Sequence, residues 1–209
     1  MGLWIAVMLL WGYAVGCLHG SVVAQKISGV NLKETGVKNA GASNATIVLG
    51  KKFGALVAAI DIGKGAGAVL LVHYFTKNAG LPEDSVALLL FLTAAAAVIG
   101  HNFPFYMNFN GGKGTATIIG VLLAIDWRVG LIGFVLFVVV ALVTDFLVFG
   151  VLMLYVTLIA MAVRADGYWP IVIAALLFAI AIWKHLENFQ RMKERSEKRV
   201  SMVFKKNIL

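Results

Sequence analysis

Long apolar stretches alternate with short polar segments along almost the whole chain. Most of these stretches approach the ~20 residues that a helix needs to cross a bilayer. The expected spans are Leu3–Val23, Phe53–Phe75, Ser85–Gly100, Thr115–Ile125, Val129–Val143, Phe146–Val163 and Tyr168–Trp183. The third and fourth are short, which indicates either partial helices or boundaries that lie several residues further out. The pattern predicts an all-α, polytopic membrane protein with about seven transmembrane helices, folded as a single domain over residues 1–209.

The composition supports a membrane protein and excludes an ordinary soluble domain. Hydrophobic residues make up 61% of the chain, charged residues make up 13%, and the mean hydropathy is +0.91. The first apolar stretch lacks a basic segment before it and a clear cleavage site after it, so we interpret it as a span and not as a signal peptide. Within it, Gly12, Gly16 and Gly20 form a face of small residues that is typical of close packing against another helix.

The distribution of charge predicts how the chain is oriented. The net charge is +8, and most of it lies in the connection 24–52 and in the tail 184–209. An even number of expected spans separates these two segments, so they share one side of the membrane. The positive-inside rule then places both in the cytoplasm and the N-terminus outside. We expect the tail to bind anionic lipid headgroups, and we expect no nucleic-acid partner.

A glycine-rich segment, residues 110–117, interrupts the apolar pattern on the same side. It reads Asn-Gly-Gly-Lys-Gly-Thr-Ala-Thr. Glycines allow a backbone to approach a ligand closely, Lys113 supplies a charge, and Thr115 and Thr117 supply hydroxyl groups. This combination favours binding of an anion such as phosphate, with a flexible re-entrant turn as the alternative. It is not a nucleotide P-loop, because Gly114 occupies the place of the Ser or Thr that the motif requires.

Two other polar segments fall on that side. Asn39, Gly41, Ser43 and Asn44 suit a tight loop against a polar ligand, although Ser43 or Asn44 could instead cap the following helix. In the tail, His185 and Asn188 are three residues apart and share one face of a helix.

One pair of opposite charges lies inside an apolar stretch. Asp61 and Lys64 are also three residues apart, so they can pair within the second span. Such a pair usually faces protein or a polar cavity. A functional role and simple neutralisation both remain open. Few other charges are buried in the spans and no internal repeat is clear, which disfavours a transporter.

The order of these motifs resembles one family. The motifs are Asn39-Ala-Gly41-Ala-Ser43-Asn44, Leu49-Gly50-Lys51-Lys52, Asp61-x-x-Lys64-Gly65, Gly100-His101-x-Phe103-Pro104, Phe109-x-Gly111-Gly112-Lys113-Gly114-x-Ala116-Thr117 and His185-x-x-Asn188. This order, from about residue 20 to residue 198, is similar to that of the bacterial acyl-phosphate:glycerol-3-phosphate acyltransferases. The Gly-His and Gly-Gly-Lys-Gly block is specific, and the other motifs become specific through their order.

The resemblance implies a fold and an activity. It implies seven membrane helices in the bacterial inner membrane and a site that faces the cytoplasm. It implies transfer of a fatty acyl group from acyl phosphate to glycerol 3-phosphate, which gives lysophosphatidic acid. Phosphate is already a good leaving group, so no cofactor and no metal are expected. The protein would position two anions and a hydroxyl group and offset their repulsion.

The resemblance also implies roles for residues of the polar segments. The expected catalytic residues are His101, Lys113, His185 and Asn188. The expected substrate-binding residues are Asn39, Gly41, Ser43, Asn44, Gly111, Gly112, Gly114, Thr115 and Thr117. His101 or His185 could orient the hydroxyl group or take its proton, and a phosphate oxygen of the substrate is the alternative base.

The chain departs from the family pattern at several polar positions. Val37-Lys38 replaces Ser-Gly, Ile47 replaces an arginine, and Asp145 and Val148 replace an arginine and a serine. A lost charge-assisted contact costs about 1.5–3 kcal/mol. Two alternatives therefore stay open beside the family activity: a divergent enzyme with another acceptor or donor, and a non-catalytic lipid-binding membrane protein.

Overall fold

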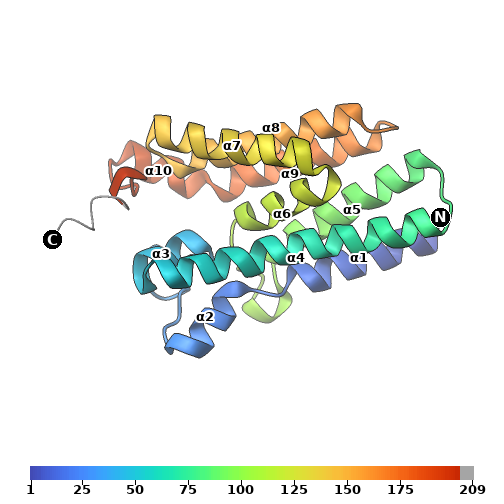
Figure 1. Cartoon of the computed structure of the whole chain (residues 1–209). Helices are drawn as coiled ribbons and strands as arrows, with labels where there is room; N and C mark the ends of the chain where they lie inside the picture. The colour runs from blue at the N-terminus through green and yellow to red at the C-terminus, as the bar shows by residue number, and fades with distance from the viewer. Residues whose placement is uncertain (203–209) are drawn as a thin grey trace.

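The structure is a computed structural model, and it describes residues 1–202. Its helices are α1 (Gly2–Gly16), α2 (Gly20–Ser28), α3 (Ala42–Leu49), α4 (Lys51–Asn78), α5 (Glu83–Asn102), a 3-10 turn (Phe105–Met107), α6 (Thr115–Ile125), α7 (Trp127–Thr144), α8 (Leu147–Arg164), α9 (Trp169–Lys184) and α10 (Leu186–Lys193). Figure 1 shows α7, α8 and α9 on one side, α1 and α4 on the other, and α5 and α6 between them. The described part of the chain is therefore an all-helical bundle, as predicted.

Each of the seven expected spans contains helix, but the helices differ in length. Within residues 1–202, five helical segments are long and apolar enough to cross a membrane, and a sixth qualifies if α9 and α10, which bend by 41°, form one span. The third expected span extends by two residues at each end and becomes the 20-residue α5. By contrast, α6 has only 11 residues, or about 16 Å, which is roughly half of a bilayer core. The partial helix expected beside the glycine-rich segment is thus α6.

The first expected span is not one continuous helix. It breaks between α1 and α2, where His19 is extended with φ −110° and ψ 126°. Two buried charges of α4 satisfy the backbone groups that the break frees: Lys64 Nζ donates to Leu18 O at 2.5 Å, and Gly20 N donates to Asp61 Oδ1 at 3.2 Å. Buried non-helical backbone is tolerated where such partners exist. The apolar pattern alone does not reveal this break.

The small-residue face of α1 packs against α5, and this prediction is confirmed. A Cβ on Gly12 would lie 2.7 Å from Thr93 O, and one on Gly16 would collide with Ala97. The same face continues past the break, where Gly20 touches Val57 of α4. Close backbone approach is how helices gain packing contacts in a membrane.

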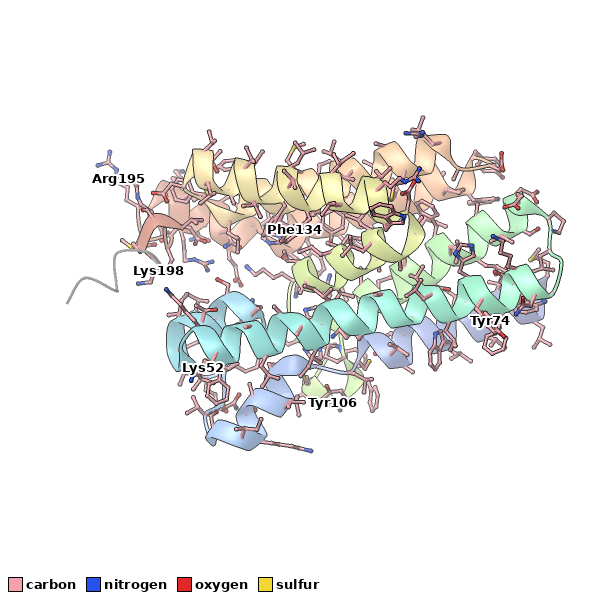
Figure 2. All side chains as sticks on the ribbon, in the orientation of Figure 1. Lys52, Tyr74, Tyr106, Phe134, Arg195 and Lys198 are labelled. Carbon is pink, nitrogen blue, oxygen red and sulfur yellow. The ribbon has the colours of Figure 1, made fainter. Side chains whose placement is uncertain are left out.

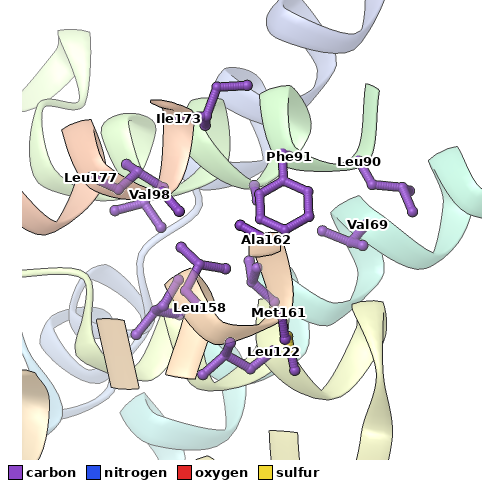
Figure 3. Close-up of a cluster of buried hydrophobic side chains, with 14 of the residues drawn as sticks. Val69, Leu90, Phe91, Val98, Leu122, Leu158, Met161, Ala162, Ile173 and Leu177 are labelled. Carbon is purple, nitrogen blue, oxygen red and sulfur yellow. The ribbon is translucent and has the colours of Figure 1, made fainter. Parts of the chain in front are cut away.

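The buried core joins the two sides of the bundle. Its largest members include Phe91 of α5, Leu122 of α6, Tyr155 and Leu158 of α8, and Leu177 of α9. Figure 3 shows part of this cluster around Phe91. The core holds α5 and α6 in place, and these two helices flank the glycine-rich segment.

The polar segments gather at one end of the bundle, as predicted. Lys33 of the α2–α3 loop donates to Asn110 Oδ1 at 2.8 Å, and Lys113 donates to Asn188 Oδ1 of α10. Figure 1 shows the N-terminus at the opposite end from α3 and α10. Figure 2 shows Lys52, Arg195 and Lys198 at the end formed by α3 and α10. The basic tail also includes residues 203–209, which lie outside the described part of the chain.

Candidate active site

The glycine-rich segment folds back onto the end of α5. Gly111 N donates to Asn102 O at 3.0 Å, and Gly112 N donates to His101 O at 3.1 Å. In this structure the two amide groups therefore donate to the protein itself and not to a ligand, and binding of substrate by Gly111 and Gly112 stays a prediction. The glycines serve close approach, because a Cβ on Gly112 would strike the His101 ring and one on Gly111 would strike His101 O.

Lys113 is the cation of the glycine-rich segment. Its Nζ donates to Asn188 Oδ1 at 2.5 Å and lies 3.9 Å from Glu187 Oε2. The side chain is only 14% exposed. Burial lowers the pKa of Lys113 to about 8, against the opposing charges of Glu187 and Glu197. A partly desolvated ammonium of this kind interacts strongly with an anion, because water competes little for it.

Lys113 lines a cleft of about 630 Å³. The lining residues are Lys33, Val37, Lys38, Asn39, Asn110, Gly111, Lys113, Trp183, Lys184, Leu186 and Glu187. They come from the α2–α3 loop, the glycine-rich segment and the α9–α10 junction, so three distant segments build one concave surface. Four lysines against one glutamate make the cleft strongly basic.

Two lysines of the cleft, Lys33 and Lys184, were not expected in the site from the sequence. Lys33 was counted only as an orientation charge and Lys184 as the start of a lipid-binding tail, whereas Lys38 was already noted as a departure from the family pattern. Burial lowers the pKa of Lys33, and the negative charge of Glu187 opposes this shift. Lys184 also lies 5.0 Å from the centre of the Phe103 ring, and Phe103 stacks on Trp183. Only the spatial arrangement shows that these cations face the same space.

The predicted residues of the α2–α3 loop divide into two groups. Asn39 lines the cleft, whereas Asn44 is fully buried and holds the loop together. Asn44 Oδ1 accepts from Val37 N at 2.9 Å, and Nδ2 lies within 2.8–3.0 Å of three loop carbonyl oxygens. The capping alternative is wrong, because Gly41 is the N-cap of α3 and no side chain caps it. Ser43 is exposed on the first turn of α3.

The remaining predicted residues surround this cleft without lining it. His185 is buried at the α9–α10 junction, and its Nδ1 lies 2.8 Å from Ala181 O. Gly114, at φ 80°, is the N-cap of α6, and Thr115 begins that helix. Thr117 is buried, and its hydroxyl has no hydrogen-bond partner among residues 1–202.

His101 belongs to a buried cluster beneath the glycine-rich segment. Its Nδ1 lies 2.8 Å from Lys64 Nζ, which also pairs with Asp61 at 2.9 Å. His19 stacks on His101 at 4.6 Å. His19, Asp61 and His101 offer ligand atoms within 4.8 Å of one another, as a metal site would require. We assign no metal to it, because the Lys64 ammonium already supplies the positive charge there.

The departures from the family pattern lie mostly outside the cleft. Val37 and Lys38 line it, but Ile47, Asp145 and Val148 do not. Val148 is buried in the helix bundle, and Asp145 binds residues of the tail. The substitutions at Ile47, Asp145 and Val148 therefore leave the lining of the cleft unchanged.

Comparison with known proteins identifies the family. The protein-family model described as glycerol-3-phosphate acyltransferase matches residues 6–195 of this chain. The chain belongs to the glycerol-3-phosphate acyltransferase family. The family inferred from the order of the motifs is thereby confirmed.

Individual members of the family match over nearly their full length. Glycerol-3-phosphate acyltransferase 1 of Oceanobacillus iheyensis is 42% identical over 197 residues, which cover 94% of this chain and 95% of the relative. The enzyme of Myxococcus xanthus is 35% identical over 196 residues, with 92% and 97% coverage. The crystal structure of PlsY, an integral membrane glycerol 3-phosphate acyltransferase in its glycerol 3-phosphate form, matches with a TM-score of 0.82 at 30% identity and covers 93% of this chain and 94% of that one. This match agrees with a multi-pass membrane protein.

Proposed function

We propose that this protein transfers a fatty acyl group from acyl phosphate to glycerol 3-phosphate and gives lysophosphatidic acid for phospholipid synthesis. The observation that carries the proposal is the basic cleft of about 630 Å³, lined by Lys113, whose ammonium donates to Asn188 of a distant helix. Both substrates carry phosphate groups. Four lysines in one concave surface offset the repulsion between two such anions better than any single cation could.

The chemistry needs no covalent enzyme intermediate. An oxygen of the glycerol hydroxyl attacks the acyl carbon, the bond from that carbon to the phosphate oxygen breaks, and inorganic phosphate leaves. Lys113 neutralises charge on the phosphate or on the developing oxyanion, and the other lysines of the cleft hold the second phosphate. Alignment of two bound reactants supplies much of the rate in such a reaction.

His185 is better placed than His101 to take the hydroxyl proton. A ring nitrogen that faces a carbonyl must carry the hydrogen, so Nδ1 of His185, at Ala181 O, leaves Nε2 free as a base. Nδ1 of His101 instead faces the Lys64 ammonium and must act as an acceptor there. His101 thus supports the glycine-rich segment, and a phosphate oxygen of the substrate is the alternative base.

The same geometry and charge also support a proposal for the membrane arrangement. We propose a single domain with seven spans, of which α6 is a partial one, with the N-terminus outside and the tail in the cytoplasm of a bacterial inner membrane. The basic end near α3 and α10 supports this orientation. The cationic tail would then contact anionic lipid headgroups.

The decisive experiment is an assay of the purified protein with acyl phosphate and labelled glycerol 3-phosphate. We expect labelled lysophosphatidic acid, and we expect its loss in Lys113→Ala. Parallel reactions with acyl thioesters test the donor, and a reaction with glycerol tests the need for the acceptor phosphate. No product from acyl phosphate, while the Oceanobacillus iheyensis relative is tested alongside and is active, would refute the proposal.

A further inference from the structure

The segment after α10 is tied back to the bundle. We call residues 194–202 the C-terminal strap. The N–H groups of Ser196 and Glu197 donate to Arg191 O, at 2.8 and 3.1 Å. Further on, the strap reaches Asp145 at the α7–α8 turn, where Val200 N donates to Asp145 O at 3.0 Å. The strap thus spans from the α10 end of the cleft to a turn between two other helices.

Asp145 is the anchor of this strap. Its carboxylate accepts from Ser201 N at 2.7 Å and from Ser201 Oγ at 3.0 Å, and it lies 3.4 Å from Arg199. Asp145 adopts φ 62°, a left-handed conformation that aspartate tolerates better than most residues. A basic residue at this position could accept none of these bonds and would repel Arg199. The carboxylate is therefore specifically suited to hold the strap.

Glu197 of the strap reaches the active site. Its Oε1 accepts from Asn188 Nδ2 at 2.6 Å, and its Oε2 accepts from Arg191 Nε at 2.6 Å. The Glu197 side chain is only 12% exposed. Asn188 in turn offers its Oδ1 to Lys113. A continuous chain of hydrogen bonds therefore runs from the strap to Lys113.

The direction of these bonds is fixed by chemistry. A carboxylate only accepts hydrogen bonds, and an ammonium only donates them. The Asn188 carboxamide between them must therefore turn its nitrogen to Glu197 and its oxygen to Lys113. Without Glu197 the amide could rotate, and its NH₂ group would then face the ammonium.

We propose that Glu197 is a positioning residue that orients Asn188 toward Lys113, and that Asp145 holds the strap that carries it. This inference rests on the proposed function only in taking Lys113 and Asn188 as active-site residues. Glu197 is one of several charged groups that face Lys113, together with Glu187, Arg191 and Lys184. Its negative charge favours the cationic form of Lys113.

The first test does not depend on turnover. The Lys113 amine is labelled with acetic anhydride at several pH values in the purified full-length protein, and the extent is read by mass spectrometry. Glu197→Ala should increase labelling at pH 7, where most of the Lys113 amine is still protonated, by about threefold, because loss of the negative charge lowers the pKa of Lys113. The matched control is Glu194→Gln, since Glu194 is exposed and, in the described part of the chain, bonds only Gln190. Equal labelling of Glu197→Ala and the wild type would overturn the proposal.

The second test uses kinetics. Glu197→Ala should reduce kcat/KM about tenfold and move the alkaline limb of its pH profile to lower pH. Glu197→Gln retains an acceptor for Asn188 and should recover most of the rate. Asp145→Ala should reduce kcat/KM in the same way as Glu197→Ala but to a smaller extent. It should also make trypsin cleave the strap faster. Wild-type kinetics in both alanine variants, or an equal loss in Glu194→Gln, would overturn the proposal. If neither the wild type nor any variant shows acyltransferase activity, the labelling test still decides whether the proposal holds.

Discussion

The imidazole ring of His101 lies against the α-carbon of Gly112, and the Gly112 N–H donates to the His101 carbonyl oxygen at 3.1 Å. This contact presses the glycine-rich segment onto the end of α5. It sets the position of Lys113, which follows directly in the chain. The His101 ring is held in place by Lys64, which contacts its Nδ1, and by His19, which stacks on it. Buried residues of the α1–α2 break, α4 and α5 thus determine where Lys113 lies.

Gly112→Ala should abolish activity without unfolding the bundle. The added methyl group would meet the His101 ring, so the segment must move and carry Lys113 away from Asn188. A displacement of about 1 Å at a reacting group can cost about 100-fold in rate. The matched control is Gly67→Ala on α4, where a Cβ meets nothing within 4 Å.

The two glycine variants are compared by acyltransferase assay and by thermal unfolding in detergent. Gly67→Ala should keep wild-type activity and gain slightly in stability, because alanine favours helix by about 1 kcal/mol over glycine. Wild-type activity in Gly112→Ala would show that the contact does not set the position of Lys113.

Activity should fall as the pH rises above about 8. Burial lowers the pKa of Lys113 to about 8, so the ammonium is present below that pH and is lost above it. Since kcat/KM reports groups of the free enzyme, its alkaline limb should lie near pH 8. In Lys113→Arg the side chain stays charged at every pH used. The alkaline decline of kcat/KM should therefore disappear in this variant, even if its maximal kcat/KM is lower than that of the wild type. An unchanged limb in Lys113→Arg would assign it to another group.

The sequence predicted the helical fold, and it predicted which segments lie together at one end of the bundle. Both predictions have physical reasons. Apolar stretches of span length leave few alternatives to a helical bundle, and the charge asymmetry placed 24–52 and the tail at one end. The sequence did not reveal the break before Gly20, because the partners that make it possible, Asp61 and Lys64, are about 40 residues away.

The composition of the cleft was harder to predict than its location. Lys33 and Lys184 carry no motif of their own, and only the tertiary fold brings them to the same cleft. Asn44 was expected to bind substrate because carboxamides suit polar ligands. A carboxamide suits a loop backbone equally well, and sequence alone does not distinguish these two uses.

Breaking the Asp61–Lys64 pair should destabilise the protein strongly. Both side chains are nearly fully buried, and the pair also joins the backbone at Leu18 and Gly20. Removing one partner of a buried pair costs about 3–5 kcal/mol, because the other charge is left uncompensated. We therefore expect Lys64→Met to unfold at a much lower temperature in detergent.

The double variant Asp61→Asn with Lys64→Met tests this explanation. It removes both charges, so it should recover a large part of the stability lost in Lys64→Met. If instead the double variant is as unstable as the sum of the two single variants, electrostatic pairing is not the reason for the loss.

Asn44→Ala should raise the KM for glycerol 3-phosphate more than it lowers kcat. The buried carboxamide holds the loop that carries Lys33 and Lys38 into the cleft, and its loss leaves buried carbonyl groups unpaired. Each such loss costs about 1–3 kcal/mol, so the loop should open and its lysines should leave the bound phosphate. Faster trypsin cleavage after Lys33 and Lys38 would accompany the rise in KM. The control is Asn78→Ala, the same substitution at an exposed residue at the far end of α4, which should match the wild type in both measurements. A raised KM with unchanged cleavage would indicate instead that Asn44 contacts the substrate itself.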